Sequence, residues 1–243
     1  MMAEEAAKTG AKRWATIAPN YAYGKDAVAA FKEVLSAKVP GVEFVGEQWP
    51  ALGKIDAAAE VQALEALKPD GIYNVTFGGD LARFVREGNT RGLFRNTAVF
   101  NLLAGEPEYL DPLKDETPQG WWVTGYPWSE INTPEHTRFR SAYEKRWKEY
   151  PRLGSVVGYS AVQTIAHAVR KAGSAETEKL VEALKGMDMP SPFGPVRWRA
   201  LDGSGRALRA MLTGWWLAAW IELALSESQQ APTESTIIVV MGK

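Results

Sequence analysis

The sequence has no cysteine and only two histidines, and each shortage excludes a kind of chemistry. Without cysteine the chain cannot form a disulfide, a cysteine-ligated zinc site, an iron–sulfur cluster or a thiol nucleophile. His136 and His167 each fall in an expected helix, without the nearby carboxylate and second histidine of a metal or acid–base site. We therefore expect no metal site, no cofactor and no catalytic residue.

Glycine-rich phosphate loops and an excess of one charge are also missing. Neither G-x-G-x-x-G nor G-x-x-x-x-G-K-[ST] occurs, and nucleotide phosphates are commonly held by loops of these two kinds. With 28 basic and 29 acidic residues, the net charge is −1, which gives no electrostatic reason for binding nucleic acid. We expect a protein that is not an enzyme and has no nucleic-acid partner.

Long hydrophobic runs are scarce as well. The most apolar stretch, 211–225, is about fifteen residues long and contains Glu222, whereas a bilayer needs about 20 apolar residues. Residues 1–13 lack the basic start, apolar centre and small-residue cleavage site of a secretory signal. The chain as written is therefore expected to have neither a membrane span nor an export signal.

Residues 13–103 alternate between strand-like and helix-like patterns. Helical spacing of apolar residues, as at Ala27, Phe31 and Leu35, separates short apolar runs that end in proline or glycine turns. Strands are expected at 13–19, 42–48, 72–77 and 98–103, and helices at 26–37, 55–67 and 81–90, the last with Asp80 as its N-cap. This alternation predicts an α/β fold with a parallel, Rossmann-like sheet flanked by helices.

The pattern changes after a further expected strand at 120–128. Three helices follow one another at 133–150, 155–172 and 174–185, and hydroxyl and acidic residues mark two of their starts, at Thr133 and Ser174. A short strand is expected at 195–199. The change of composition near residues 125–133 indicates a boundary between two lobes.

Six segments in this order resemble the branched-chain-amino-acid-binding group of type I periplasmic solute-binding proteins, which serve ABC importers. They are KRWATI at 12–17, PNYAYG at 19–24, ALKPD at 66–70, FGGD at 77–80, GYSA at 158–161 and SPFGPV at 191–196. The resemblance implies two α/β lobes joined by crossing strands, with a ligand enclosed as the lobes close.

On that plan, residues 11–124 are the second lobe, 125–132 a hinge crossing, 133–190 the helices of an incomplete helical first lobe and 191–202 a return strand. The family has a long stretch before the part that matches here, so we expect a fragment that lacks the N-terminal part. Residues 203–243 form an atypical tail, rich first in arginine and alanine and then in tryptophan. This tail suggests the hypothesis of a shifted reading frame.

Ligand-binding residues are expected where strands end, because open α/β sheets bind ligands at the carboxyl ends of their strands. Tyr23 follows the first strand, Phe77 and Gly78 follow the third, and Asn101 lies at the end of the fourth. Relatives that hold an ammonium group often place an acidic residue in this last region, whereas Glu106 comes later here. That difference leaves amides, aromatic acids and other small solutes open beside amino acids.

The resemblance implies the substrate-binding component of an ABC transporter, located in the periplasm. Its partners would be a small solute, such as an amino acid, amide or small acid, and a membrane permease. Two alternatives stay open: a ligand-sensing regulatory domain of the same fold, which the missing export signal favours, and a truncated product without function. The identity of the ligand and the oligomeric state are left open by the sequence.

Overall fold

The computed structural model describes residues 2–198, 200 and 238–240 of the chain. It divides into two compact units: unit 1 is Met1–Tyr126 with Ile237–Lys243, and unit 2 is Pro127–Thr236. Every helix in the described part of the chain is too short or too polar to cross a membrane.

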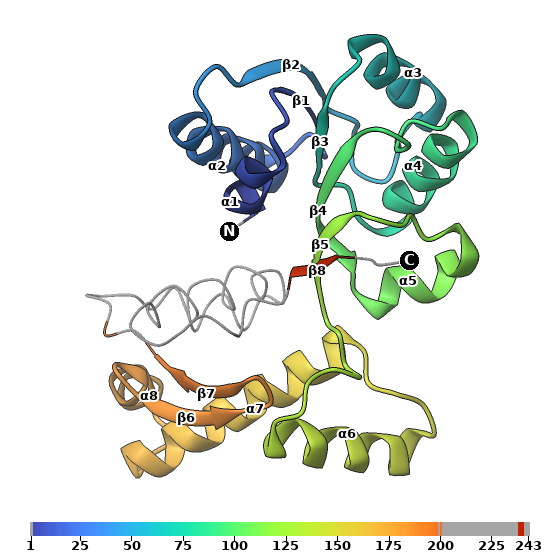
Figure 1. Ribbon diagram of the computed structural model, residues 1–243. Helices are drawn as coiled ribbons and strands as arrows, with labels where there is room; N and C mark the ends of the chain where they lie inside the picture. Colours follow the sequence, from blue (N-terminus) through green and yellow to red (C-terminus); the bar gives the residue numbers. More distant parts are fainter. Residues whose placement is uncertain (1, 199, 201–237, 241–243) are drawn as a thin grey trace. The chain divides into compact units, whose positions relative to one another are not determined.

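Unit 1 is built on a sheet with the strand order β2-β1-β3-β4-β5-β8 (Figure 1). The first five strands are parallel and β8 runs antiparallel to β5. Their bounds are β1 Arg13–Ile17, β2 Glu43–Gln48, β3 Gly71–Asn74, β4 Ala98–Gly105, β5 Trp122–Gly125 and β8 Ile238–Val240. The predicted α/β fold with a parallel sheet is confirmed.

Helices cover both faces of this sheet (Figure 1), as right-handed βαβ connections require. One face carries α1 and α2, and the other carries α3, α4 and α5. The bounds are α1 Met2–Ala6, the 3-10 turn η1 Ala7–Thr9, α2 Ala22–Lys38, α3 Ala57–Leu67, α4 Gly78–Arg91, α5 Pro107–Leu113 and the 3-10 turn η2 Lys114–Glu116.

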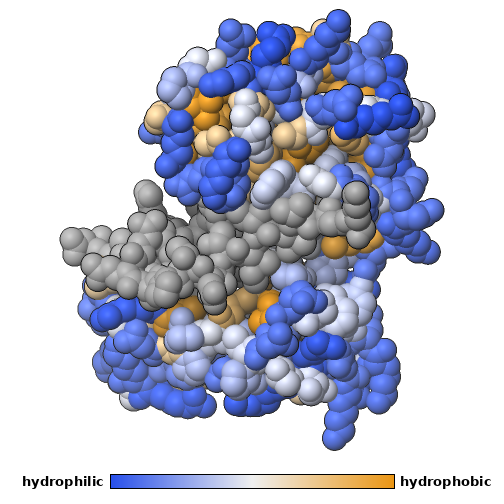
Figure 2. Space-filling view, viewed as in Figure 1, coloured by the Kyte–Doolittle hydropathy of each residue, from blue (hydrophilic) through white to orange (hydrophobic). Residues whose placement is uncertain are grey.

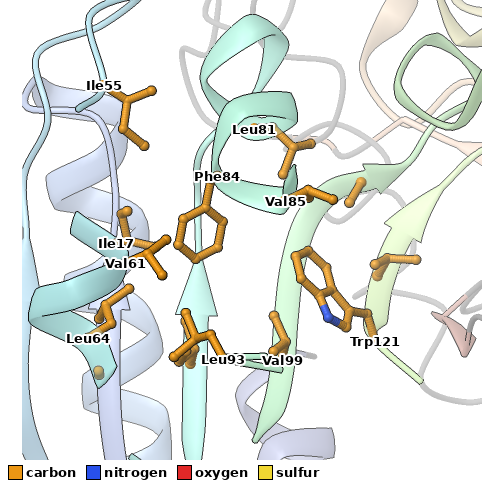
Figure 3. Close-up of a cluster of buried hydrophobic side chains, with 14 of the residues drawn as sticks. Ile17, Ile55, Val61, Leu64, Leu81, Phe84, Val85, Leu93, Val99 and Trp121 are labelled. Carbon is orange, nitrogen blue, oxygen red and sulfur yellow. The ribbon is translucent and has the colours of Figure 1, made fainter. Parts of the chain in front are cut away.

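The two faces of the sheet are packed differently. On the α3–α5 side the core is mainly aliphatic, with Ile17, Ile72 and Val99 of the strands facing Leu81 and other residues of the helices (Figure 3). On the α1–α2 side it is aromatic: Trp14, Phe31, Tyr73, Phe100 and Trp122 form a chain of ring contacts with centroids 4.0–5.6 Å apart. Burying such large side chains is the main force that holds the sheet and helices together.

The described part of unit 2 consists of three helices and a hairpin. The helices are α6 Pro134–Trp147, α7 Leu153–Ala172 and α8 Thr177–Leu184, and the hairpin pairs β6 Asp188–Ser191 with β7 Gly194–Arg197. Thr133 caps α6 as predicted, because its hydroxyl accepts the backbone N–H of His136 at 3.1 Å. The small core of unit 2 is formed by Ala168, Leu184, Met187, Met189 and Trp198.

The surface visible in Figure 2 is mainly hydrophilic, with smaller hydrophobic areas between the charged residues. Among the described residues, the large hydrophobic side chains that are exposed are Leu52, Trp147, Val162 and Ile165.

Two helix starts differ from the sequence prediction. The helix expected from residue 26 begins at Ala22, because Gly24 lets its first turn lie directly against the carbonyl of Pro19. Asp80 is not an N-cap: α4 begins at Gly78, and the Asp80 carboxylate instead accepts the backbone N–H groups of Gly53 at 2.7 Å and Ile55 at 3.3 Å. This carboxylate therefore fixes the loop before α3.

The other differences concern short elements and the tail. Ser174 does not begin α8; the helix starts at Thr177, and the Ser174 hydroxyl accepts the N–H of Glu176 in the turn before it. Strand β6 was not predicted from the sequence, because its residues do not follow a clear strand pattern and position 190 is a proline. Of the tail expected at 203–243, only Ile238–Val240 are described, as β8; the apolar stretch at 211–225 lies outside the described residues.

Candidate functional site

Three segments of unit 1 meet at the carboxyl edge of the sheet. Two of them follow β1 and β3, at residues 18–24 and 75–79, and the third, at 101–106, is the last part of β4 with Glu106; the three strands are parallel neighbours. Since parallel strands all end at the same edge, the sequence places the predicted residues Tyr23, Phe77, Gly78 and Asn101 close to one another. This edge is the candidate site.

Aromatic rings form one part of the edge. Tyr23, in the first turn of α2, and Phe77, the residue before α4, contact edge to face with their ring centroids 6.1 Å apart. Tyr21 adds a third ring, 5.9 Å from Tyr23. Tyr23 and Phe77 are only half-buried, so each keeps apolar surface that a solute can cover. Tyr21 was missed by the sequence prediction, although it belongs to the same 19–24 motif.

Gly78 has a conformation that requires glycine, since its φ of +59° is strained for residues with a Cβ. A Cβ at Gly78 or Gly79 would meet no atom within 4 Å, so the backbone there is open to an approaching molecule. The backbone of Gly78 also acts on Tyr109 of α5, whose pKa it lowers against the larger effect of burial.

Asn101 is fully buried, and its side chain bonds to the backbone. Its carbonyl oxygen accepts the N–H groups of Leu103 at 2.8 Å and Ala104 at 2.6 Å, and its amide nitrogen donates to the carbonyl of Thr76 at 3.4 Å. These bonds hold the end of β4 and join it to the segment that carries Phe77. In this geometry Asn101 acts on the site by positioning its backbone.

A second buried asparagine supports the same segment. Asn74 lies directly beside Asn101 in the pairing of β3 with β4, and its carbonyl oxygen accepts both the N–H and the hydroxyl of Thr76 at 2.8 and 2.7 Å. These bonds turn the chain sharply after β3. The sequence motif Asn74-Val75-Thr76 thus serves to shape the edge.

Glu106, just after β4, is the buried carboxyl group of this edge, with 8% of its surface exposed. Burial, reinforced by the negative charge of Glu108, raises the pKa of Glu106 to about 8. Burial and the charge of Glu106 likewise raise the pKa of Tyr109 to about 12. Glu106 and Tyr109 were not among the predicted site residues. Distance from the strand end in sequence hid them, since α5 folds back over the edge.

The described residues contain no group of three or more side chains that could hold a metal ion. The edge offers a ligand aromatic surface, open glycine backbone and a largely buried carboxyl group. This arrangement is suited to binding.

Comparison with known proteins places this architecture in a family. Residues 1–218 match the model of a family described as periplasmic binding protein. A comparison with curated proteins found no match.

Solved structures share the fold over about half of their own length. A solute-binding protein of an ABC transporter from Rhodopseudomonas palustris BisB5, in complex with 3,4-dihydroxybenzoic acid, is 28% identical with a TM-score of 0.71, over 82% of this chain and 55% of that one. An ABC-type branched-chain amino acid transporter from Rhodopseudomonas palustris CGA009 is 27% identical with a TM-score of 0.62, over the same shares.

A third structure agrees in fold at lower identity. The amino acid ABC transporter substrate-binding protein from Pseudomonas fluorescens Pf-5 has a TM-score of 0.71 at 20% identity, over 79% of this chain and 51% of that one. With the family match covering most of the sequence and the parallel sheet in place, the chain belongs to the periplasmic binding protein family, with the type I fold.

Proposed function

We propose that this chain binds a small organic solute at the carboxyl edge of the unit 1 sheet, as part of the substrate-binding component of an ABC importer. The observation that carries the proposal is the meeting of Tyr23 and Phe77, two half-buried aromatic side chains from separate strand ends. The proposed role is that of a binding protein rather than an enzyme, and the solute-binding proteins to which it is similar support this.

The solute is proposed to present a flat or apolar group to this edge. Three aromatic rings, from Tyr21, Tyr23 and Phe77, favour such a group, because ring faces and edges pack on apolar surface. The similar structures include a protein that holds a dihydroxybenzoic acid and one named as a branched-chain amino acid transporter. Of these two classes, the aromatic acid is the one proposed, because the rings of Tyr21, Tyr23 and Phe77 offer it aromatic packing surface.

Family membership also supports a location and a partner. We propose that the protein acts in the periplasm and delivers its solute to a membrane permease of an ABC importer. Both proposals rest on the descriptions of the similar proteins. This chain spans about half the length of those proteins.

Residues 125–132 are proposed as the hinge segment, with the bend near Pro127. Before Pro127, Tyr126 is buried in unit 1 and its N–H donates to the carbonyl of Gly105 at 3.3 Å. After Pro127, Trp128 stacks on Tyr150 of unit 2 with centroids 4.4 Å apart, and the guanidinium of Arg140 lies over Trp128. Because Tyr126 is held by unit 1 and Trp128 by unit 2, any rotation of one unit against the other is expected to occur in the few backbone bonds between these two residues.

A thermal-shift screen of the purified chain tests the proposed function. The probes are 3,4-dihydroxybenzoate, benzoate, L-leucine and L-glutamine, each at about 1 mM, which is roughly 1,000-fold above a micromolar Kd. We expect a cooperative transition that moves upward by a few degrees with the aromatic acids. A cooperative transition that none of the four moves would contradict solute binding by this chain.

A further inference from the structure

Building on the proposed solute site, we propose that Glu106 is its specificity-determining residue: the buried carboxyl group keeps its proton and donates it to an oxygen atom of the solute. The solute class is thereby an aromatic compound that carries a hydroxyl or carbonyl oxygen in addition to the group that anchors it elsewhere. Four observations lead to this assignment.

The first observation is that the carboxyl group forms no bond within the described residues. Glu106 is 8% exposed as a whole, and neither a hydrogen bond nor an ion pair joins its carboxyl oxygens to a described residue. The oxygens themselves keep some accessible surface. A carboxyl group that is largely buried, accessible at its oxygens and unbonded in the protein is placed to take its hydrogen-bond partner from a ligand.

The second observation concerns charge. The titratable groups on α5, η2 and α4 are Glu108, Tyr109, Asp111, Lys114, Asp115, Glu116, Asp80, Arg83, Arg86, Glu87 and Arg91. The arginines of α4 pair with other carboxylates: Arg83 with Asp80, Arg86 with Glu116 and Arg91 with Glu65 and Glu87. Among these groups, the negative charge of Glu108 raises the pKa of Glu106, in addition to the larger effect of burial. Since no described cation neutralises it, Glu106 is stable as the uncharged acid.

The third observation agrees on the protonation state. A pKa of about 8 leaves Glu106 mainly protonated at neutral pH, and a protonated carboxyl group gains an O–H donor. A carboxylate, by contrast, only accepts hydrogen bonds. In the free protein this edge therefore presents a donor to the solute, which suits an oxygen acceptor.

The fourth observation places Glu106 at the site. Glu106 directly follows β4, and Asn101 of β4 donates to the carbonyl of Thr76, the residue before Phe77. Gly78 directly follows Phe77, whose ring contacts Tyr23. Glu106 therefore lies at the same edge as the open glycine backbone and the aromatic rings, where a solute that covers the rings could extend an oxygen.

The test is a titration calorimetry comparison of benzoate and 3,4-dihydroxybenzoate, with L-leucine as a third compound, on the full chain at pH 6. The variants are Glu106→Gln, which keeps a donor of similar shape, and Glu106→Leu, which removes it. We expect wild type to bind the dihydroxy compound at least ten-fold more tightly than benzoate. Glu106→Gln should keep most of this preference, while Glu106→Leu loses it and binds benzoate within two-fold of wild type.

Other outcomes overturn the proposal and separate it from the proposed function. If both compounds bind and Glu106→Leu keeps the preference, Glu106 does not read the oxygen, while solute binding stands. Another outcome is that only L-leucine binds, that its binding releases a proton from the protein, and that Glu106→Gln no longer binds it. Glu106 would then be an anion that holds the ammonium group, and the donor role would be wrong. If wild type binds none of the three, both proposals fail together.

A pH profile of the free protein checks the protonation state independently of any solute. Because the folded-state pKa of Glu106 lies above the ordinary value of 4.5, its contribution to stability is complete below pH 4.5 and is lost as pH rises through about 8. The melting temperature of wild type is expected to fall relative to that of Glu106→Gln between pH 6 and 8.5. Parallel profiles for the two proteins would show an ionised carboxylate and overturn the donor role.

Discussion

Replacing Gly125 with alanine is expected to destabilise unit 1 by about 3 kcal/mol or more, because the added methyl group has no space. Gly125 pairs with Gly105 where β5 meets β4, and a Cβ on Gly125 would lie 2.1 Å from the carbonyl carbon and oxygen of Gly105. Those atoms are backbone, so relief requires the two strands to separate. Urea unfolding followed by tryptophan fluorescence measures the loss.

The matched control is Gly158→Ala in α7. A Cβ there meets no atom within 4 Å, and the helical backbone accepts alanine. Since alanine is favoured over glycine inside helices, this variant should be neutral or more stable by up to about 1 kcal/mol. An equal loss in both variants would mean that the close approach of β4 and β5 is not what Gly125 provides.

The second large effect is on binding. Tyr23→Ala and Phe77→Ala should each weaken binding of 3,4-dihydroxybenzoate at least ten-fold, which corresponds to about 1.4 kcal/mol. The reason is that each removes one of two rings in edge-to-face contact, so the remaining ring loses both its neighbour and its orientation. Calorimetric titration of each variant against wild type measures the change.

Two controls separate this effect from a general loss of structure. Tyr23→Phe keeps the ring and should bind within about three-fold of wild type if the ring carries the contact, a difference of about half of the 1.4 kcal/mol that ten-fold represents. Trp147→Ala removes an aromatic side chain that is 57% exposed in unit 2 and should leave affinity unchanged. Unaltered binding in both alanine variants at the edge would contradict the assignment of the aromatic rings.

The sheet and the gathering of the strand ends could be predicted because both depend on local patterns. Apolar spacing indicated the alternation of strands and helices, and a parallel sheet then brings the residues after β1, β3 and β4 together whatever their side chains are. The contact between Tyr23 and Phe77 is a direct result of that rule.

What could not be predicted depends on long-range contacts. Asp80 has the position and chemistry of an N-cap, yet its carboxylate bonds to Gly53 and Ile55, residues that are distant in sequence. Asn101 looked like a ligand-binding residue, but its amide is used by the backbone, since β4 continues to Gly105. Whether Asn101 contacts the solute stays a prediction.

Glu106 was assessed in the sequence only by its distance from the strand end. A short helix, α5, follows it and buries it beside Tyr109, and this burial changes the carboxyl group from an expected anion into an acid. Burial of one side chain depends on the whole fold, so no local pattern announces it.

The central claim is that the carboxyl edge of the unit 1 sheet binds the solute, and NMR mapping of amide shifts tests it most directly. The ¹⁵N-labelled chain is titrated with 3,4-dihydroxybenzoate, and with L-leucine in parallel. We predict that the largest changes fall in residues 20–24, 76–79 and 101–106, at the ends of β1, β3 and β4. Changes centred on the opposite edge, around Lys12, Asp70 and Thr97, or confined to unit 2 would contradict the claim.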